Sequence, residues 1–483
     1  MGSELKNKVA AGVAWNIAEK VGSMLLQMVV SLIVLNRLMP EDVGVMAILT
    51  FFTSIALAVV DSGFSQTLIR KNNPTNEDFG SVFAFNMAMS AALYALLTAV
   101  APWVARYYSM PVIADIAPVL FLLLPVHALC VIQNTLFTKE FRFGVLSRVT
   151  FVSSLAGGIT AVVMALAGCG VWSLVFQRLA AAAVKSAILW AMNTRPPIRS
   201  FSAAALREMS PFSLRLLGTD LISSVYNNIA QMFIGKIYSG EVLGYFNQAQ
   251  KFKDLPVTST LQSVQSVTYP ALSAIGDNPA KFAESYRQVL MTVAFMMFPM
   301  MAGLAAVSED LFLLLGPQWM PTVPYLRILC LTGFFAPLSA IALNILKVHG
   351  DGRAIITLEV VKKLIMTVIL IATVWRGVTA VAWGLVAVAV SEFAINLPAS
   401  LRRTSLTLRQ VVRTLLPVAL VTAAMYAAVV LAGNLSGELP TAARLAVKIL
   451  TGVAAYIVLS LGFRLESARE VKSIALRLVG LQQ

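Results

Sequence analysis

Charged side chains lie within segments that are otherwise apolar, and most of these charges are basic. A charge at the middle of a bilayer costs about 2.5–3.5 kcal/mol on insertion scales, so it usually faces a protein interior or a water-filled cavity. The pattern therefore predicts a wet, cationic cavity between helices, which suits an anionic cargo. The charged residues within or near the edges of apolar stretches are Lys20, Asp61, Arg178, Lys185, Arg215, Asp220, Lys251, Lys253, Glu359, Lys362 and Glu392.

The basic and acidic members of this set suit different chemistry. A Lys acts on a phosphate as a point charge and an Arg as a bidentate donor. The cations predicted to bind an anion are Lys20, Arg178, Lys185, Arg215, Lys251, Lys253 and Lys362. The acids that could bind a coupling ion are Asp61, Asp220, Glu359 and Glu392, together with Glu19, which precedes Lys20. Structural ion pairs are the alternative, and they are the simpler interpretation of Glu359 and Lys362, which lie one helical turn apart.

Uncharged polar residues gather in two neighbouring segments, near residues 211–236 and 242–272. Polar packing between helices is the ordinary explanation of such residues. The density in the second segment instead favours a hydrophilic wall that faces a cleft. The amides singled out are Asn227, Asn228, Gln231, Asn247, Gln248 and Gln250.

The elements that carry these residues are predicted to be transmembrane helices. Hydrophobic residues make up 58% of the 483-residue chain and charged residues 12%. A helix needs about 20 mainly apolar residues to span the hydrocarbon core. The sequence thus predicts an all-α integral membrane protein with about fourteen spans, of which the first, eighth and eleventh are the most polar. The predicted spans are 9–36, 43–66, 80–105, 112–136, 145–168, 170–191, 211–236, 242–272, 287–308, 322–346, 353–375, 378–400, 412–433 and 443–463.

The distribution of Lys and Arg among the loops predicts the orientation. Cytoplasmic loops of membrane proteins are rich in these residues. With the N-terminus inside, only Arg37, Arg106, Lys236, Arg376 and Arg444 fall in outer loops. Both termini are therefore predicted to be cytoplasmic. The net charge of +14 then reflects orientation and contact with anionic membrane lipid, and no nucleic-acid partner is expected.

Motifs for catalysis, metal binding and nucleotide binding are not found in the sequence. It contains no Walker A loop, HExxH, paired CxxC or GxSxG pattern. His127 and His349 stand alone, and His127 is predicted to be a satisfied core residue. We therefore predict a transporter rather than an enzyme, with no cofactor and no metal.

The chain repeats itself. Residues 36–47 read NRLMPEDVGVMA and residues 236–247 read KIYSGEVLGYFN, an offset of 200 residues in which Gly44 meets Gly244. Weaker matches follow in the same order further along the chain. Because each copy holds six spans, the two copies have the same orientation, and an axis along the membrane normal should relate them.

The repeat predicts two parallel six-helix bundles and two additional C-terminal helices. Rocking of such bundles about a central cleft gives alternating access. The predicted parts are an N-terminal bundle at 1–192, a cytoplasmic linker at 193–210, a C-terminal bundle at 211–402, two transmembrane helices at 403–463 and an amphipathic cytoplasmic tail at 464–483.

Two segments resemble a known family. Asp61-Ser62-Gly63-Phe64-Ser65-Gln66-Thr67-Leu68-Ile69-Arg70 closes the second predicted span, and Gly244-Tyr245-Phe246-Asn247-Gln248-Ala249-Gln250-Lys251 opens the eighth, before Pro256. Both are similar to the bacterial polysaccharide transporter family, which includes Wzx-type flippases. That family belongs to the superfamily that also contains multidrug and toxin extrusion proteins and the lipid II flippases. The resemblance covers the whole chain.

The resemblance implies a flippase for cell-surface polysaccharide biosynthesis. Its cargo would be an undecaprenyl-diphosphate-linked oligosaccharide, turned from the inner to the outer leaflet of the bacterial cytoplasmic membrane. The cationic residues would then bind the diphosphate, and the amides would face the sugar. The polysaccharide assembly machinery is a candidate partner.

The energy source and the closest rival function stay open in the sequence. Outward movement of an anion is downhill in an inside-negative membrane, and antiport of sodium or a proton is the alternative. A multidrug and toxin extrusion antiporter of the same superfamily is the alternative function. The excess of deep Lys and Arg argues against it, because such an exporter of organic cations would favour an anionic cavity.

Overall fold

The computed structural model describes residues 19, 22–24, 26–192, 201–274, 279–348 and 350–463, and the side-chain surroundings of all of them except 259 and 262–279. Three predictions lie outside these residues. They are Lys20 as an anion-binding residue, the part of the linker at 193–200, and the amphipathic tail at 464–483.

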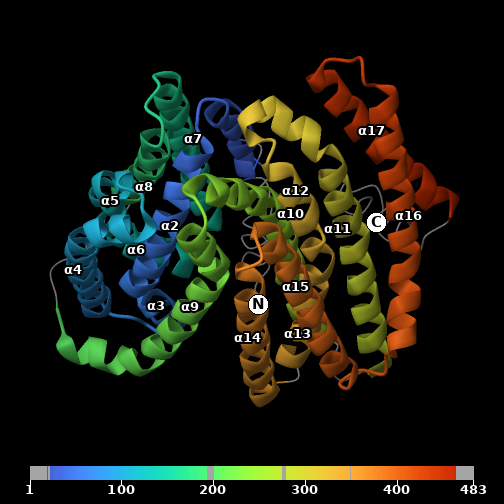
Figure 1. Cartoon of the computed structure of the whole chain (residues 1–483). Helices are drawn as coiled ribbons and strands as arrows, with labels where there is room; N and C mark the ends of the chain where they lie inside the picture. The colour runs from blue at the N-terminus through green and yellow to red at the C-terminus, as the bar shows by residue number, and fades with distance from the viewer. Residues whose placement is uncertain are drawn as a thin grey trace. The chain divides into compact units, whose positions relative to one another are not determined.

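The chain divides into two compact units, Met1–Asn247 and Gln248–Gln483. In the described parts of both units, every regular element is a helix (Figure 1). The first unit begins with an apolar helical stretch at Gly22–Leu35. Its further helices are α2 (Pro40–Asp61), α3 (Phe64–Arg70), α4 (Asn76–Tyr108), α5 (Val112–Phe121), α6 (Leu123–Lys139), α7 (Phe143–Leu166), α8 (Trp172–Met192), α9 (Ala203–Ile237) and the start of α10 (Gly240–Ala274).

The second unit contains the remainder of α10 and the helices that follow it. These are α11 (Pro279–Leu315), the short 3-10 helix η2 (Pro317–Trp319), α12 (Thr322–Cys330), α13 (Thr332–Val348), α14 (Gly352–Val374), α15 (Val378–Leu401), α16 (Leu408–Leu435) and α17 (Thr441–Gly462).

Ten helical segments of the described chain are long and apolar enough to cross a membrane, so this is a multi-pass membrane protein. The helices at the predicted seventh, eighth and eleventh spans are α9, α10 and α14, with 35, 35 and 23 residues. They have the necessary length but not the apolar composition. The reason is their polar content. The sequence predicts this high polarity for the eighth and eleventh spans but not for the seventh. The count of fourteen and the two-bundle arrangement stay predictions.

The second predicted span is not one continuous helix. It breaks at Ser62 and Gly63, whose φ angles are 46° and 68°. This left-handed backbone suits Gly, and space requires it too, because a Cβ atom on Gly63 would lie 2.8 Å from the carbonyl oxygen of Ser213. The first residues of the family-like segment at 61–70 therefore form a helix break, and the rest forms the short helix α3.

Helix α9 packs against α2, α3 and α4 of the first unit, as Figure 1 illustrates for α2 and α3. A buried cluster joins α3, α4, α6 and α9 through Phe64, Phe83, Ile132 and Met209. A buried hydrogen bond of 2.7 Å also links the hydroxyl groups of Thr67 and Ser213. Helix α9 starts at Ala203 because the Ser202 side chain caps it, accepting from the backbone N–H of Ala205. Part of the predicted linker is therefore helical.

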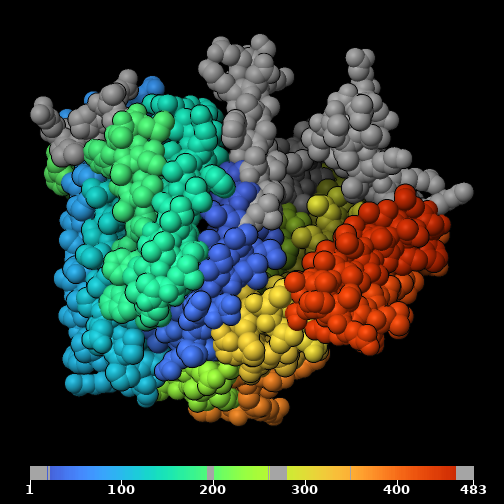
Figure 2. All heavy atoms as spheres, turned by 90° about the horizontal axis from the view of Figure 1, so that it is seen from above, coloured from blue at the N-terminus to red at the C-terminus, as the bar shows by residue number. Residues whose placement is uncertain are grey.

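The two C-terminal helices are attached to α11. Asp310 of α11 is 1% exposed and forms ion pairs with Arg444 and Lys448 of α17. Further along α17, the Tyr456 hydroxyl donates to the carbonyl oxygen of Phe295 at 2.8 Å. Figure 2 shows the side chains of α16 and α17, in orange to red, packed against one another. These contacts hold the two additional helices to the second unit.

Candidate functional site

Two of the predicted cations lie on one stripe of α8. Arg178 and Lys185 are seven residues apart, which places them two turns apart on the same face. The same stripe carries Val175 and Leu189, both 0% exposed. Because α8 packs against α5, α6 and α7, this stripe faces the interior of the first unit. Both cations are half-buried.

Two groups of α6 lie near Lys185, and an acid lies near one of them. His127 of α6 is within electrostatic range of both Lys185 and Asp61. Cys130, one turn further along α6, also lies within electrostatic range of Lys185. Asp61 ends α2, is half-buried, and accepts a hydrogen bond from the Ser65 hydroxyl. The first unit thus brings together one acid, one imidazole and one amine from three helices.

His127 was predicted to be a satisfied core residue, and the structure places it differently. Its side chain is half-buried and has no hydrogen-bond partner among the described residues. The sequence signal that could have found it is the family-like segment that ends α2, since α2 and α3 both pack against α6. Only the fold brings Asp61 and His127 together.

A second group of charges joins α14 and α15 in the second unit. Lys362 is 5% exposed and forms an ion pair with Glu359, one turn earlier on α14. The simpler interpretation of this pair, a salt bridge, is confirmed. Glu392 of α15 is half-buried and lies within range of the charges of Lys362, Lys363 and Glu359. This group therefore contains both signs in balance.

Helix α10 passes from the first unit into the second after Asn247, and its predicted charges follow that residue in the sequence. Lys253 forms an ion pair of 2.5 Å with its neighbour Asp254. Lys251 is exposed. Gln248 is 1% exposed, and its side-chain nitrogen has no hydrogen-bond partner. Asn247 and Gln250 are half-buried.

The predicted residues of α9 lie mainly at the surface of the first unit. Arg215, Asp220 and Asn227 are exposed, whereas Asn228 and Gln231 are half-buried. The Asn228 side chain donates to the backbone carbonyl of Ser224 at 2.8 Å. Near the N-terminus, Glu19 accepts a hydrogen bond of 2.8 Å from the Ser23 hydroxyl.

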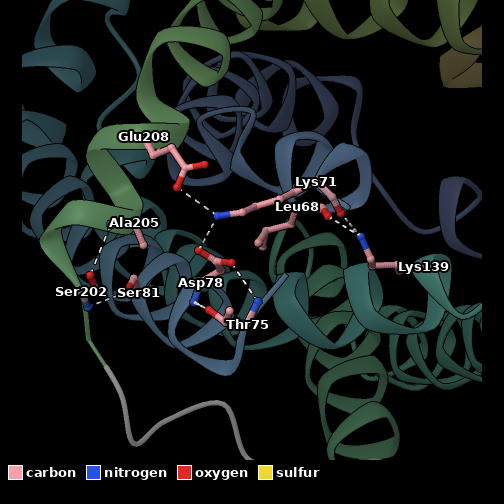
Figure 3. A network of polar contacts seen from close by, with 9 residues as sticks. All are labelled: Leu68, Lys71, Thr75, Asp78, Ser81, Lys139, Ser202, Ala205 and Glu208. Atoms are coloured by element: carbon pink, nitrogen blue, oxygen red, sulfur yellow. Dashed lines mark hydrogen bonds and ion pairs between the residues drawn. The ribbon is translucent and has the colours of Figure 1, made fainter. Parts of the chain in front are cut away.

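A charged network that the sequence did not indicate joins α3, α4 and α9 (Figure 3). Lys71 Nζ lies 3.1 Å from Asp78 Oδ1 and 3.1 Å from Glu208 Oε2. The Asp78 side chain is 3% exposed, and its other oxygen accepts from the Thr75 backbone N–H at 2.8 Å. The network therefore fixes the beginning of α9 to the loop between α3 and α4.

Lys139 completes this region at the end of α3. Its Nζ donates to the carbonyl oxygens of Leu68, Ile69 and Lys71 at 2.9, 3.2 and 2.6 Å. Carbonyl groups at a helix C-terminus have no partner within the helix and carry partial negative charge. Lys139 satisfies them, so it serves the structure. We call Lys71, Asp78, Lys139 and Glu208 the lysine network.

Comparison with known proteins identifies the family. The fold is similar to that of solved membrane transporters, one of which is described as a member of the MOP superfamily. Residues 34–324 match the family model described as "Polysaccharide biosynthesis protein". Since this match spans more than half of the chain, the protein belongs to the polysaccharide biosynthesis protein family.

Three similar proteins illustrate this assignment. The succinoglycan biosynthesis transport protein ExoT of Rhizobium meliloti (strain 1021) is 25% identical, over 72% of this chain and 70% of its own length. The structure of the lipid II flippase MurJ in an inward closed conformation has a TM-score of 0.70 and 14% identity, over 94% of this chain and 99% of that chain. An inward-facing multidrug resistance MATE family transporter of the MOP superfamily has a TM-score of 0.65 and 15% identity, over 79% and 94%.

Proposed function

We propose that this protein is a flippase for a lipid-linked oligosaccharide in cell-surface polysaccharide biosynthesis. It would move an undecaprenyl-diphosphate-linked glycan from the inner to the outer leaflet of the bacterial cytoplasmic membrane by alternating access, with both termini in the cytoplasm. The observation that carries this proposal is the family match over residues 34–324. The printed name of ExoT, a transport protein of succinoglycan biosynthesis, supports it.

Arg178 and Lys185 are the strongest candidates for binding the diphosphate. No carboxylate of the described residues lies within ion-pair distance of either one. Lys253 and Lys362, in contrast, are already paired with Asp254 and Glu359. An unpaired charge inside a membrane protein is costly, so it is retained where function needs it. A diphosphate would supply the missing negative charge.

The other predicted cations take secondary roles in the proposal. Arg215 and Lys251 are exposed, so they suit first contact with a headgroup rather than tight binding. Lys253 and Lys362 could bind phosphate only in competition with their carboxylates. Lys20 lies outside the described residues and keeps its predicted role as a candidate.

The glycan would be held by the amides of α9 and α10. Asn227 is exposed, and the side-chain nitrogen of Gln248 has no partner. A buried donor without a partner costs free energy that a ligand oxygen could recover. Asn228, Gln231, Asn247 and Gln250 complete the proposed polar wall.

The membrane potential could drive this transport without a coupling ion. The potential is worth about 2.3 kcal/mol per charge per 100 mV, so a diphosphate with roughly two charges would gain about 4–5 kcal/mol. Antiport of a proton or sodium is the alternative. Asp61 is then the best candidate, because His127 lies within its electrostatic range and within that of Lys185. Glu19, Asp220, Glu359 and Glu392 are weaker candidates.

An antiporter of organic cations is the alternative function, and the MATE-like fold keeps it open. The α8 stripe argues against it, since Arg178 and Lys185 would repel a cationic drug. The cargo of the proposed flippase carries the opposite charge. We therefore favour the flippase, with the polysaccharide assembly machinery as its candidate partner.

A flipping assay in proteoliposomes tests the proposal. Vesicles would contain a lipid-diphosphate oligosaccharide, and an impermeant reagent would report its exposure in the outer leaflet. We expect flipping by the unmodified protein and its loss in Arg178→Gln and Lys185→Gln. Arg376→Gln, in a predicted outer loop, is the matched control and should flip normally.

The possible outcomes separate the site from the function. Flipping that survives both α8 substitutions would overturn the diphosphate site and keep the function. Absence of flipping, together with extrusion of cationic dyes, would move the protein to the drug-exporter branch. Folding of each variant is checked by its elution as a single species in size-exclusion chromatography.

A further inference from the structure

The beginnings of α2 and α10 cross with their backbones in contact. A Cβ atom on Gly44 would lie 1.9 Å from the carbonyl oxygen of Gly240. A Cβ atom on Gly244 would lie 1.8 Å from the carbonyl oxygen of Pro40. No side chain fits at either position, since real Cβ atoms do not approach an oxygen so closely. We call Pro40, Gly44, Gly240 and Gly244 the glycine crossing, and all four belong to the first unit.

The crossing is reciprocal. Pro40 begins α2, and its carbonyl oxygen faces Gly244, the fifth residue of α10. Gly240 begins α10, and its carbonyl oxygen faces Gly44, the fifth residue of α2. Pro40 and Gly240, like Gly44 and Gly244, differ by the 200-residue offset of the sequence repeat. Two surfaces that contact each other through equivalent residues must lie on a local two-fold axis. The axis of the repeat therefore passes through this contact.

Neighbouring residues hold the two helix ends closely. The Met110 methyl carbon would be 2.5 Å from a Cβ atom on Gly240, and Leu243 of α10 would be 3.0 Å from a Cβ atom on Gly235 of α9. Lys236 donates to the Tyr107 carbonyl at 2.6 Å and lies 3.9 Å from the centre of its ring. Leu243 is fully buried. The crossing is thus a closed, well-packed end of the first unit.

We propose that the glycine crossing closes the outer end of the transport path and parts when cargo leaves. The inference rests on the proposed function. In a transporter built from two parallel repeats, the path runs along the repeat axis. A backbone contact on that axis blocks the path at its own end. Pro40 and Gly240 begin the helices that follow the predicted outer loops, so the blocked end is the outer one.

The type of contact suits a closure that opens. Helices that meet at glycines are held by dispersion and weak Cα–H···O contacts. Separating them leaves no charge without its partner, so the cost stays moderate. The part that moves is therefore the glycine crossing, and no charged pair has to break.

Distances between spin labels test the proposal. Labels would be placed at Met39→Cys and Ser239→Cys, two exposed positions directly before the crossing, with Cys130, Cys169 and Cys330 replaced by Ser. We expect a main population at a short distance and a minor one at a longer distance. Gly44→Ala and Gly244→Ala should each raise the ratio of long to short by about tenfold or more, because an added methyl group cannot fit.

The chain offers matched controls. Gly218→Ala and Gly303→Ala add the same methyl group in α9 and α11, where nothing lies within 4 Å, and should leave the distances unchanged. Gly157→Ala adds it 2.6 Å from the Gln177 carbonyl, between α7 and α8. It should lower the thermal stability without changing the distances, which separates general strain from opening of the crossing.

Unchanged distances in both Gly44→Ala and Gly244→Ala, in folded protein, would overturn the proposal. A single short distance in every state of the unmodified protein, including during active flipping, would also overturn it. The label distances do not depend on transport. If the glycine variants open the crossing but the unmodified protein flips no lipid, the closure stands and the proposed function fails.

Discussion

The two ends of the first unit are closed by different interactions. At one end, the lysine network joins α3, α4 and α9 through ion pairs of 3.1 Å. At the other end, the glycine crossing joins α2 and α10 through backbone contacts. When an ion pair separates, each charge loses its partner. For a buried carboxylate such as Asp78, the loss leaves an uncompensated charge and costs much free energy. The lysine network therefore suits a permanent attachment, and the crossing suits a contact that opens.

Helix α9 runs between these ends, so it relates one to the other. Its beginning is tied by Glu208 and Ser213, and its end at Gly235 lies beside Leu243 and Ile48. The network holds α9 on the first unit while α2 and α10 separate at the far end. Substitutions at four places, and one pH titration, test this difference between the two ends.

The largest effect is expected at the crossing, in the double variant Gly44→Ala with Gly244→Ala. Either substitution alone already separates the same two backbones. The double variant should therefore open the crossing little more than each single variant, although independent sites would add their free energies. Spin-label distances in all four proteins measure this. Fully additive effects would show that the two glycine contacts form separately.

The next largest effect is expected at Lys71. Lys71→Met leaves the Asp78 carboxylate buried without its cation and should lower the free energy of unfolding by about 1–3 kcal/mol. Thermal unfolding in detergent measures this change. Lys71→Arg keeps the charge and should recover most of the stability. A Lys71→Met protein as stable as the unmodified one would show that the network contributes nothing.

The same network predicts a pH dependence. The hydrogen bond from Lys71 to Asp78 raises the pKa of Lys71 above its ordinary value of 10.5, with Glu208 adding to it. A raised lysine pKa means stability that is complete below the unfolded pKa and lost as pH rises through the folded one. The difference in stability between the unmodified protein and Lys71→Met should hold up to about pH 10 and shrink above it. Loss of this difference between about pH 7 and pH 9, where both Lys71 and Asp78 are charged, would contradict the pairing.

A smaller effect is expected for the hydroxyl pair of α3 and α9. Thr67→Val removes the 2.7 Å hydrogen bond to Ser213 and should cost about 1 kcal/mol in the free energy of unfolding. Thr67→Val with Ser213→Ala removes both partners and should cost no more, because no buried hydroxyl is left unpaired. Equal stability of all three proteins would exclude this bond as an attachment of α9.

The smallest effect is expected at Glu208, whose side chain is 67% exposed. Glu208→Gln should change the free energy of unfolding by less than about 1 kcal/mol, since surface ion pairs contribute little. Added salt should reduce even this difference. Thermal unfolding at low and high ionic strength checks it. A loss comparable to that of Lys71→Met would mean that Glu208, rather than Asp78, holds the network together.

Patterns within a helix were predictable from the sequence. Glu359 and Lys362 lie one turn apart, so their ion pair follows from spacing alone. The Arg178 and Lys185 stripe follows from a spacing of seven residues in the same way. The weak apolar character of α10 and α14 was likewise visible in their composition. The family itself was recognisable from residues 61–70 and 244–251.

Contacts between distant segments were not predictable. Lys71 and Glu208 are 137 residues apart, and no local pattern pairs them. His127 was predicted to be an ordinary core residue. The prediction missed its charged neighbours, because Asp61 and Lys185 approach it from other helices. The break at Ser62 and Gly63 was missed since apolar residues continue on both sides, so hydropathy alone gives one span. The glycine repeat was visible at positions 44 and 244, but only the structure reveals that its two copies touch.

The reciprocity of the glycine crossing also bears on ancestry. If the two halves arose by duplication of one gene, the ancestral six-helix chain would have formed this contact with a second copy of itself. One substitution in that ancestor would have altered both sides of the interface together. After fusion each side mutates separately, so the halves can diverge while the contact persists. Pro40 in one half and Gly240 in the other occupy equivalent positions but differ in residue type, whereas Gly44 and Gly244 are the same. Such a difference is the divergence that this history leaves.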